Sequence, residues 1–98
     1  KKFIPPADLD EASKKILRDY LNADGTIRQV PEQKKIKPIL DYLLQNFEFD
    51  RTYTEREVNI IIKRFNEDSA GLRRDLVDAG MLARESDGSK YWRVQDGK

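Results

Sequence analysis

Apolar residues recur at helical spacing along this chain, and each recurrence predicts an amphipathic helix. The first predicted helix covers about residues 9–21, with Asp8 as its N-terminal cap and Gly25 in the turn that follows. Its apolar face is formed by Leu9, Ala12, Ile16, Leu17, Tyr20 and Leu21. The second covers about residues 34–47, where Pro38 is tolerated in the first turn or else kinks the helix. Its broad apolar stripe is formed by Ile36, Ile39, Leu40, Leu43, Leu44 and Phe47.

The most basic window of the chain, residues 28–37, lies where the first of these helices gives way to the second. It contains Arg28, Lys34, Lys35 and Lys37 against the single acidic residue Glu32. Two interpretations stay open at this point. The window is either a solvated loop that leads into the first helical turn, or an arm that contacts phosphates. Residues 26–30 predict a short strand that Pro31 closes.

Residues 55–79 predict two short helices in tandem, preceded by a short strand near Tyr53. Thr54 and Glu57 have the spacing of a capping box, in which each side chain accepts a hydrogen bond from the other residue's amide. The first helix buries Val58, Ile61, Ile62 and Phe65 and leaves Ile60 off its apolar stripe. Asp68 or Ser69 caps the second helix. The second helix turns Leu72, Leu76 and Ala79 inward, and Gly80 ends it in a left-handed conformation.

Residues 81–94 predict a β-hairpin. Asp87-Gly88 between two strand-like runs favours a type I′ turn, in which Glu85 faces Lys90 and Ala83 faces Trp92. The predicted fold class is therefore mainly α with a small β-hairpin or short sheet (α+β). More specifically, we expect one domain over residues 1–98, a winged helix-turn-helix with an extra N-terminal helix and a wing at about residues 81–94.

This order of elements predicts a function as well as a fold. The second helix of a helix-turn-helix enters the major groove of duplex DNA, and a wing beside it reaches the DNA backbone. The candidate nucleic-acid-binding residues are Ser69, Arg73, Arg74, Lys90, Lys34 and Lys35, and the wing also carries Arg84 and Arg93. We expect the DNA-binding domain of a bacterial transcriptional regulator, with duplex DNA as its partner.

The balance of basic and acidic residues favours an alternative to DNA binding. The whole chain has 19 basic and 18 acidic residues and a formal charge of +1. Between residues 54 and 93 we count eight basic and eight acidic residues, so any basic surface must come from placement. Arg74 is spaced to pair with Asp78 one turn further along the helix, and Arg64 can pair with Asp68. The alternative function is a non-catalytic protein-interaction or dimerisation module, with Ile60 as a contact.

The amino-acid composition argues against several other classes of protein and site. The chain has no Cys and no His, which removes disulfides, thiol nucleophiles, the usual zinc ligands and the commonest general base. We therefore expect no enzyme, metal or cofactor. No apolar run approaches the roughly 18 residues that span a bilayer, so we expect a cytoplasmic protein without a membrane partner. Because Lys1 rather than Met begins the chain, we also expect a domain of a longer regulator.

Most of the chain from Asp24 to Arg93 resembles a bacterial family known as domain of unknown function 2087. The resemblance is carried by Tyr53-Thr54-Glu55-Arg56-Glu57-Val58-Asn59, Leu72-Arg73-Arg74-Asp75-Leu76-Val77-Asp78 and Asp87-Gly88-Ser89-Lys90-Tyr91-Trp92-Arg93. Asp24-Gly25-Thr26-Ile27 is similar to the opening of the family pattern. The resemblance implies a winged-helix-like domain of transcriptional regulators, in some cases behind a separate DNA-binding domain. It implies no catalytic or ligand-binding residues.

Overall fold

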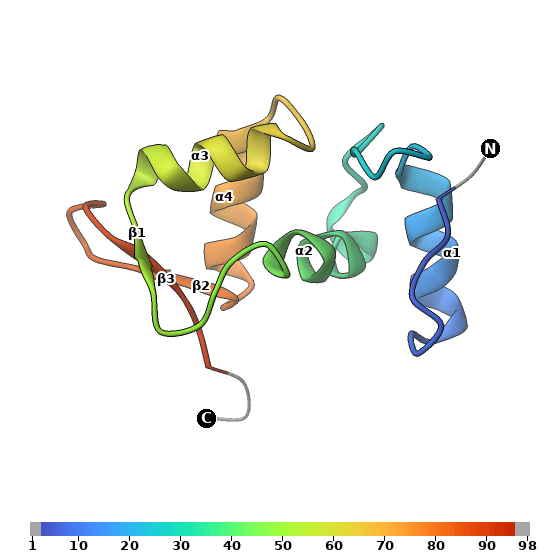
Figure 1. Cartoon of the computed structure of the whole chain (residues 1–98), viewed down its shortest axis with the longest axis horizontal. Helices are drawn as coiled ribbons and strands as arrows, with labels where there is room; N and C mark the ends of the chain where they lie inside the picture. Colours follow the sequence, from blue (N-terminus) through green and yellow to red (C-terminus); the bar gives the residue numbers. More distant parts are fainter. Residues whose placement is uncertain (1–2, 96–98) are drawn as a thin grey trace.

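The computed structural model describes residues 3–95 of the chain. This part contains four α-helices and a three-stranded antiparallel sheet (Figure 1). The elements in chain order are α1 (Glu11–Tyr20), the 3-10 helix η1 (Gln33–Lys35), α2 (Lys37–Leu44), β1 (Thr52–Tyr53), α3 (Glu55–Lys63), α4 (Ser69–Asp78), β2 (Leu82–Arg84) and β3 (Tyr91–Arg93). The sheet lies at one end of the molecule and α1 at the other, with α2 between them (Figure 1). The fold class is thus a small α+β domain.

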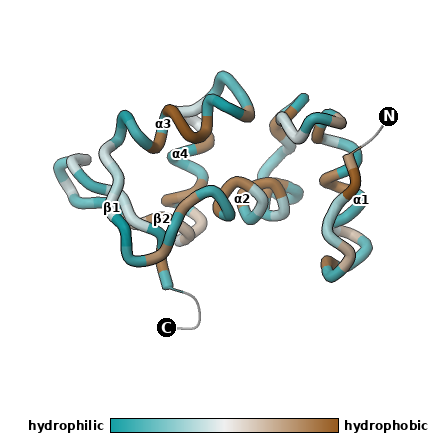
Figure 2. The backbone as a smooth tube through the Cα atoms, viewed as in Figure 1, coloured by the Kyte–Doolittle hydropathy of each residue, from teal (hydrophilic) through white to brown (hydrophobic). Residues whose placement is uncertain are grey.

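The core is built around α2, whose whole predicted stripe is buried. Figure 2 shows hydrophobic residues along α2 and on α3 above it. The buried apolar residues are Leu17, Leu21, Ile27, Ile36, Ile39, Leu40, Leu43, Leu44, Phe47, Tyr53, Val58, Ile62, Leu72, Leu76, Leu82 and Tyr91. Helix α1 contributes Leu17, α3 contributes Val58 and Ile62, and α4 contributes Leu72 and Leu76. One continuous core therefore joins all four helices to the inner face of the sheet.

The sheet has the order β1-β3-β2, so β1 joins the far strand of the hairpin. Ala83 lies opposite Trp92, as the sequence predicts, and Tyr53 lies opposite Tyr91. Because side chains alternate across a strand, Tyr53, Tyr91 and Leu82 share the buried face, and Trp92 lies on the other face. This resolves which face of the predicted hairpin is covered.

The hairpin turn is not the predicted type I′ turn. Such a turn needs a positive φ at both central residues, and in this loop only Gly88 has one, at 76°. The Gly88 amide donates to the Glu85 carbonyl at 2.9 Å, and the Glu85 amide donates to the Lys90 carbonyl at 2.9 Å. Ser86 and Asp87 therefore form the corner, and Gly88 is the left-handed residue that returns the chain to β3.

The first half of the chain differs from the prediction in three places. Asp8 lies in a turn closed by the Leu9 amide and the Pro6 carbonyl, so α1 begins later, after Asp10. Residues 26–30 do not form a strand, because Ile27 makes only an isolated bridge to Leu21. The predicted helix over residues 34–47 is divided into η1 and α2, since the ring of Pro38 conflicts with an α-helical turn before it.

Smaller corrections concern single residues. Ala12 and Ala79 are exposed rather than inward-facing, and Ala79 is the C-terminal cap of α4. Gly80 does take the predicted left-handed conformation, with φ at 77°. Phe49 is 41% exposed, whereas Tyr53 is buried and its hydroxyl accepts a hydrogen bond from the Glu48 amide at 2.7 Å.

The ends of α3 and α4 are set by local hydrogen bonds. The Thr54 hydroxyl accepts from the Glu57 amide at 3.1 Å, and the Glu57 carboxylate accepts from the Thr54 amide at 2.8 Å, which confirms the capping box. Asp68, rather than Ser69, caps α4 by accepting from the Gly71 amide at 3.1 Å. A Cβ atom on residue 71 would lie 2.5 Å from the Asp68 carboxylate, so a larger residue there would require the Asp68 side chain to shift.

Replacing Thr54 with Ala should lower the free energy of unfolding by about 1 kcal/mol, because the Glu57 amide loses its acceptor. For a domain of this size the loss corresponds to a fall of roughly 4–8 °C in the melting temperature. Urea denaturation monitored by circular dichroism measures both. Thr54→Ser keeps the hydroxyl and is the matched control. Equal stability of the Ala and Ser variants would contradict the structural role of the box.

Candidate functional site

Helix α4 presents one exposed stripe to solvent. Leu72 and Leu76 face the core, and the stripe on the opposite side consists of Ala70, Arg74 and Asp78, spaced one helical turn apart. Ala70 lies in the first turn of the helix and Arg74 near its middle. Arg74 makes no hydrogen bond or ion pair within residues 3–95, so the expected pair with Asp78 is not formed there. The Arg74 guanidinium is available to a partner.

Ser69 lies inside the domain rather than on this stripe. It is 6% exposed, and its amide donates to the Glu67 carbonyl at 2.8 Å. A residue with so little accessible surface offers almost nothing to a DNA groove. The structure therefore removes Ser69 from the predicted set of binding residues, because the cap at Asp68 places it on the buried side of the first turn.

Arg73 is held by other parts of the fold. Its Nη1 donates to the Asn59 Oδ1, and its Nη2 lies 3.9 Å from the Glu55 Oε2. The Tyr91 hydroxyl in turn donates to the Glu55 Oε1 at 3.4 Å. With its side chain 15% exposed, Arg73 joins α4 to α3, and Glu55 extends the connection to β3. We interpret Arg73 as a structural residue that also lends positive charge to its surroundings.

A pocket of about 240 Å³ lies where α4 meets the hairpin. Its lining residues are Arg73, Arg74, Val77, Asp78, Arg84 and Tyr91. Three arginines and one acidic residue, Asp78, thus line the pocket. The Arg84 side chain donates to the carbonyls of Glu85 and Ser86, at 3.2 and 3.1 Å, which holds it beside the hairpin loop. The sequence identified Arg84 only as a further residue of the predicted wing. The packing of the hairpin against α4 places it in the lining of this pocket.

The 3-10 helix η1 lies on the other flank of α4. Gln33 donates to the Asp75 carboxylate at 3.4 Å, and Asp75 is on the side of α4 away from Arg73. A second pocket, of about 250 Å³, is lined by residues of η1, α2 and α4 on this flank. Lys34 and Lys35 follow Gln33 directly and are exposed. The basic window therefore lies alongside α4, although it is distant in sequence.

The hairpin tip carries charges of both signs. Lys90 is exposed beside the loop. Hydrogen bonds from Ser89, above all from its side chain, lower the pKa of Asp87 below its ordinary value, so this carboxylate stays charged to a more acidic pH than a free aspartate. Arg93 is directed elsewhere, because its Nη1 donates to the Phe47 carbonyl at 3.0 Å and its guanidinium stacks 4.0 Å from the Phe49 ring. Arg84 is thus the basic residue of the hairpin that lies beside α4, and Lys90 is exposed at the hairpin loop.

The described residues contain no cluster of typical metal ligands and no membrane-spanning helix. Among residues 3–95, no group of three or more Asp, Glu, His or Cys side chains is placed to hold a metal ion. None of the helices in this part of the chain is long and apolar enough to cross a membrane.

Comparison with known proteins identifies a family match. The model of a family described as "Uncharacterized protein conserved in bacteria (DUF2087)" matches residues 26–93, which include every element from η1 to β3. Helix α1 and the segment before it lie outside the matched region. No curated protein and no solved structure matches the chain.

The two neighbouring arginines of α4 should differ in their effect on stability. Arg73→Ala removes the contacts with Asn59 and Glu55 and should lower the free energy of unfolding by about 1–2 kcal/mol. Arg74→Ala should change it by less than about 0.5 kcal/mol, because the side chain is exposed and unpaired. Urea titration of both variants makes the comparison. Equal losses would contradict the structural assignment of Arg73.

Proposed function

We propose that this chain, which belongs to the bacterial family DUF2087, is a winged-helix domain that binds duplex DNA through α4 and the hairpin. The succession α2, β1, α3, α4 and hairpin, with β1 paired to β3, supports a helix-turn-helix followed by a wing. In such a domain α4 is the helix that enters the major groove. The domain belongs to a transcriptional regulator in this proposal.

One observation carries the proposal. The exposed stripe of α4 lies between two basic flanks, with Arg84 on the hairpin side and Lys34-Lys35 on the side of η1. A major groove is bordered by two phosphate backbones, so a helix inserted in it needs cations on both sides. The flanks provide them. Each then neutralises one backbone while the helix between them faces the base edges.

The stripe itself fits a groove at its N-terminal half. Ala70 is small and allows close approach, and the unpaired Arg74 can reach a base edge or a phosphate. Asp78 lies one turn beyond Arg74, at the C-terminal end of α4, so it is at the rim of the groove when the start of the helix is inserted. The revised set of contacts is Arg74, Arg84, Lys90, Lys34 and Lys35, with Ser69 omitted and Arg73 in a supporting role.

Charge sets the strength of this binding. With only +1 overall, the domain creates a weak long-range field, so the basic flanks act mainly at short range. We expect a dissociation constant for random-sequence duplex of about 10⁻⁴ to 10⁻⁶ M, with strong salt dependence. Tighter binding requires a specific site, which the contacts of Arg74 select.

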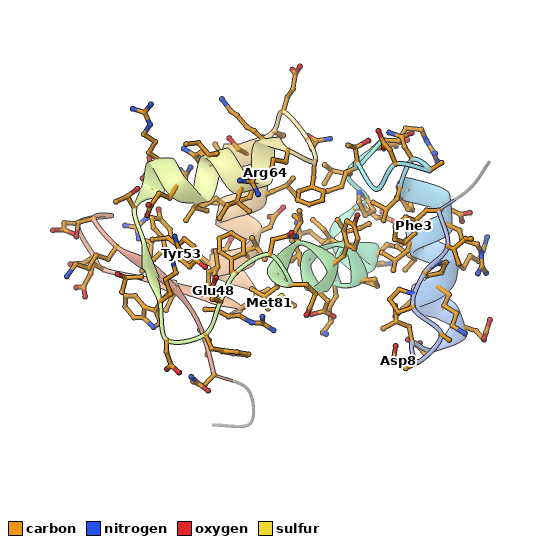
Figure 3. The ribbon with its side chains drawn as sticks, viewed as in Figure 1. Phe3, Asp8, Glu48, Tyr53, Arg64 and Met81 are labelled. Atoms are coloured by element: carbon orange, nitrogen blue, oxygen red, sulfur yellow. The ribbon has the colours of Figure 1, made fainter. Side chains whose placement is uncertain are left out.

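The exposed outer face of α3 favours a second candidate function, the protein-interaction module. Ile60 is 49% exposed there, and a pocket of about 250 Å³ lies beside it. Glu48, Arg51, Glu57 and Arg64 give this pocket two charges of each sign, a balance that suits contact with a second copy of the chain. Figure 3 places Glu48, Tyr53 and Arg64 around this region.

A DNA titration tests the first function. Fluorescence anisotropy with a labelled random duplex, repeated over a series of salt concentrations, should give a binding constant that falls steeply with salt. Arg74→Ala and Arg84→Ala should each weaken binding about threefold to tenfold and reduce the salt slope by roughly 1. Arg18→Ala is the matched control, because Arg18 is an exposed arginine on the remote α1. No binding at low salt, or equal losses for Arg18 and Arg74, would overturn the proposal.

Sedimentation tests the second function. If α3 mediates self-association, the wild-type chain should show a concentration-dependent rise in mass, and Ile60→Glu should abolish it. Ile4→Glu is the control, since Ile4 is also exposed but lies before α1. A strict monomer for the wild-type chain would exclude the dimer.

A further inference from the structure

A pocket of about 350 Å³ lies between α1 and α2, at the end of the molecule opposite the sheet. One wall comes from the N-terminal segment and α1, which contribute Pro6, Asp8, Leu9, Ser13 and Leu17. The other wall comes from α2 and the residue after it, and consists of Pro38, Asp41, Tyr42 and Gln45. The first wall lies outside the region that the family shares, so the pocket arises where the added segment packs on the common domain.

The walls of this pocket are fixed by packing. The N-terminal segment runs back along α1 before the helix begins (Figure 1). Phe3 packs edge-on against Tyr42 of α2, with 5.5 Å between the ring centroids. The Tyr42 hydroxyl donates to the Gly25 carbonyl at 2.5 Å, and its ring also meets Phe65 edge-on at 5.7 Å. Tyr42 therefore anchors both the segment and the turn after α1 to the core.

The lining combines apolar carbon with negative charge. Pro6, Leu9, Leu17 and Pro38 supply the apolar surface. Asp8 and Asp41 supply two carboxylates, and among the described residues no Lys or Arg lines the pocket. Lys37 forms an ion pair with Asp41 through a 2.8 Å contact from outside the lining. The Asp8 carboxylate makes no hydrogen bond or ion pair within residues 3–95.

This chemistry selects one class of ligand. An anion would be repelled by Asp8, and a neutral apolar molecule would cover a carboxylate without pairing it, which costs free energy. An ammonium group attached to an apolar body satisfies both parts of the lining. The volume is at the lower end of the range for small-molecule sites, so the ligand is small.

We propose that the pocket between α1 and α2 binds a small organic amine, with its apolar body against Leu9, Leu17 and Pro38 and its ammonium group at Asp8. The Asp41 carboxylate and the Ser13 hydroxyl are the additional acceptors within the same lining. This site is remote from α4 and the hairpin, and the inference stands independently of DNA binding.

Three probes of the same size and shape test the charge selection. Phenethylamine, 2-phenylethanol and phenylacetate are titrated into the ¹⁵N-labelled chain, and amide chemical shifts are followed. We expect phenethylamine to bind with a dissociation constant of about 1 mM or lower and to shift the amides of Leu9, Ser13, Leu17, Asp41 and Gln45. The alcohol should bind at least about fivefold more weakly, and the carboxylate should not bind. Equal affinity for the amine and the alcohol, or amine shifts confined to other regions, would overturn the proposal.

Two variants test the assigned residues. Asp8→Asn should weaken amine binding about fivefold without changing the fold, because the side chain is exposed and unpaired. Glu67→Gln removes an equal charge from an exposed position in the turn before α4 and should leave the affinity unchanged. Ser13→Phe should occupy the pocket and abolish binding while the circular dichroism spectrum stays native. Unchanged affinity in Asp8→Asn would contradict the role of its carboxylate, whatever the fate of Ser13→Phe.

Discussion

Burial of α2 is the constraint on which the rest of the structure depends. Ile39 and Leu43 have no accessible surface, and Leu40 is 2% exposed. Full burial of such side chains contributes about 1.5–3 kcal/mol each relative to exposure, which is a large share of the stability of a small domain. A stripe this broad needs cover from more than one side. Helix α1 and helix α4 both pack against α2, so the elements that carry the two candidate sites are held in place by the same helix.

The two sites nevertheless differ in chemistry. Basic residues from η1, α4 and the hairpin flank the exposed stripe of α4, whereas two carboxylates face apolar carbon between α1 and α2. A chain with a formal charge of +1 thus separates its charges in space. The net charge of the chain therefore does not describe the charge of either surface. Arg73 and Arg74 illustrate the same point at the scale of one helix, since only the Arg74 side chain has no hydrogen-bond or ion-pair partner within residues 3–95.

Local patterns in the sequence predicted those features that depend on near neighbours. The capping box at Thr54 and Glu57 spans one helical turn, so its geometry follows once the helix begins. The pairing of Ala83 with Trp92 follows from the short loop between the strands. The apolar stripe from Ile36 to Phe47 correctly predicted which residues of this segment are buried. Predictions failed where several local outcomes have similar energies, as with Asp8 against Asp10 and with the exact turn before Gly88.

The candidate sites required the tertiary structure. Sequence alone determined the succession of helices and hairpin, the faces of α2 and α3, and the exposed position of Ile60, because hydrophobic periodicity acts within each element. Only the packed fold placed Arg84 beside Arg74 and Lys34-Lys35 along the other flank of α4. It also buried Ser69, tied Arg73 to Asn59 and brought Asp8 to α2. These placements join residues far apart in the chain, and the shared core, rather than any local pattern, decides which of them meet.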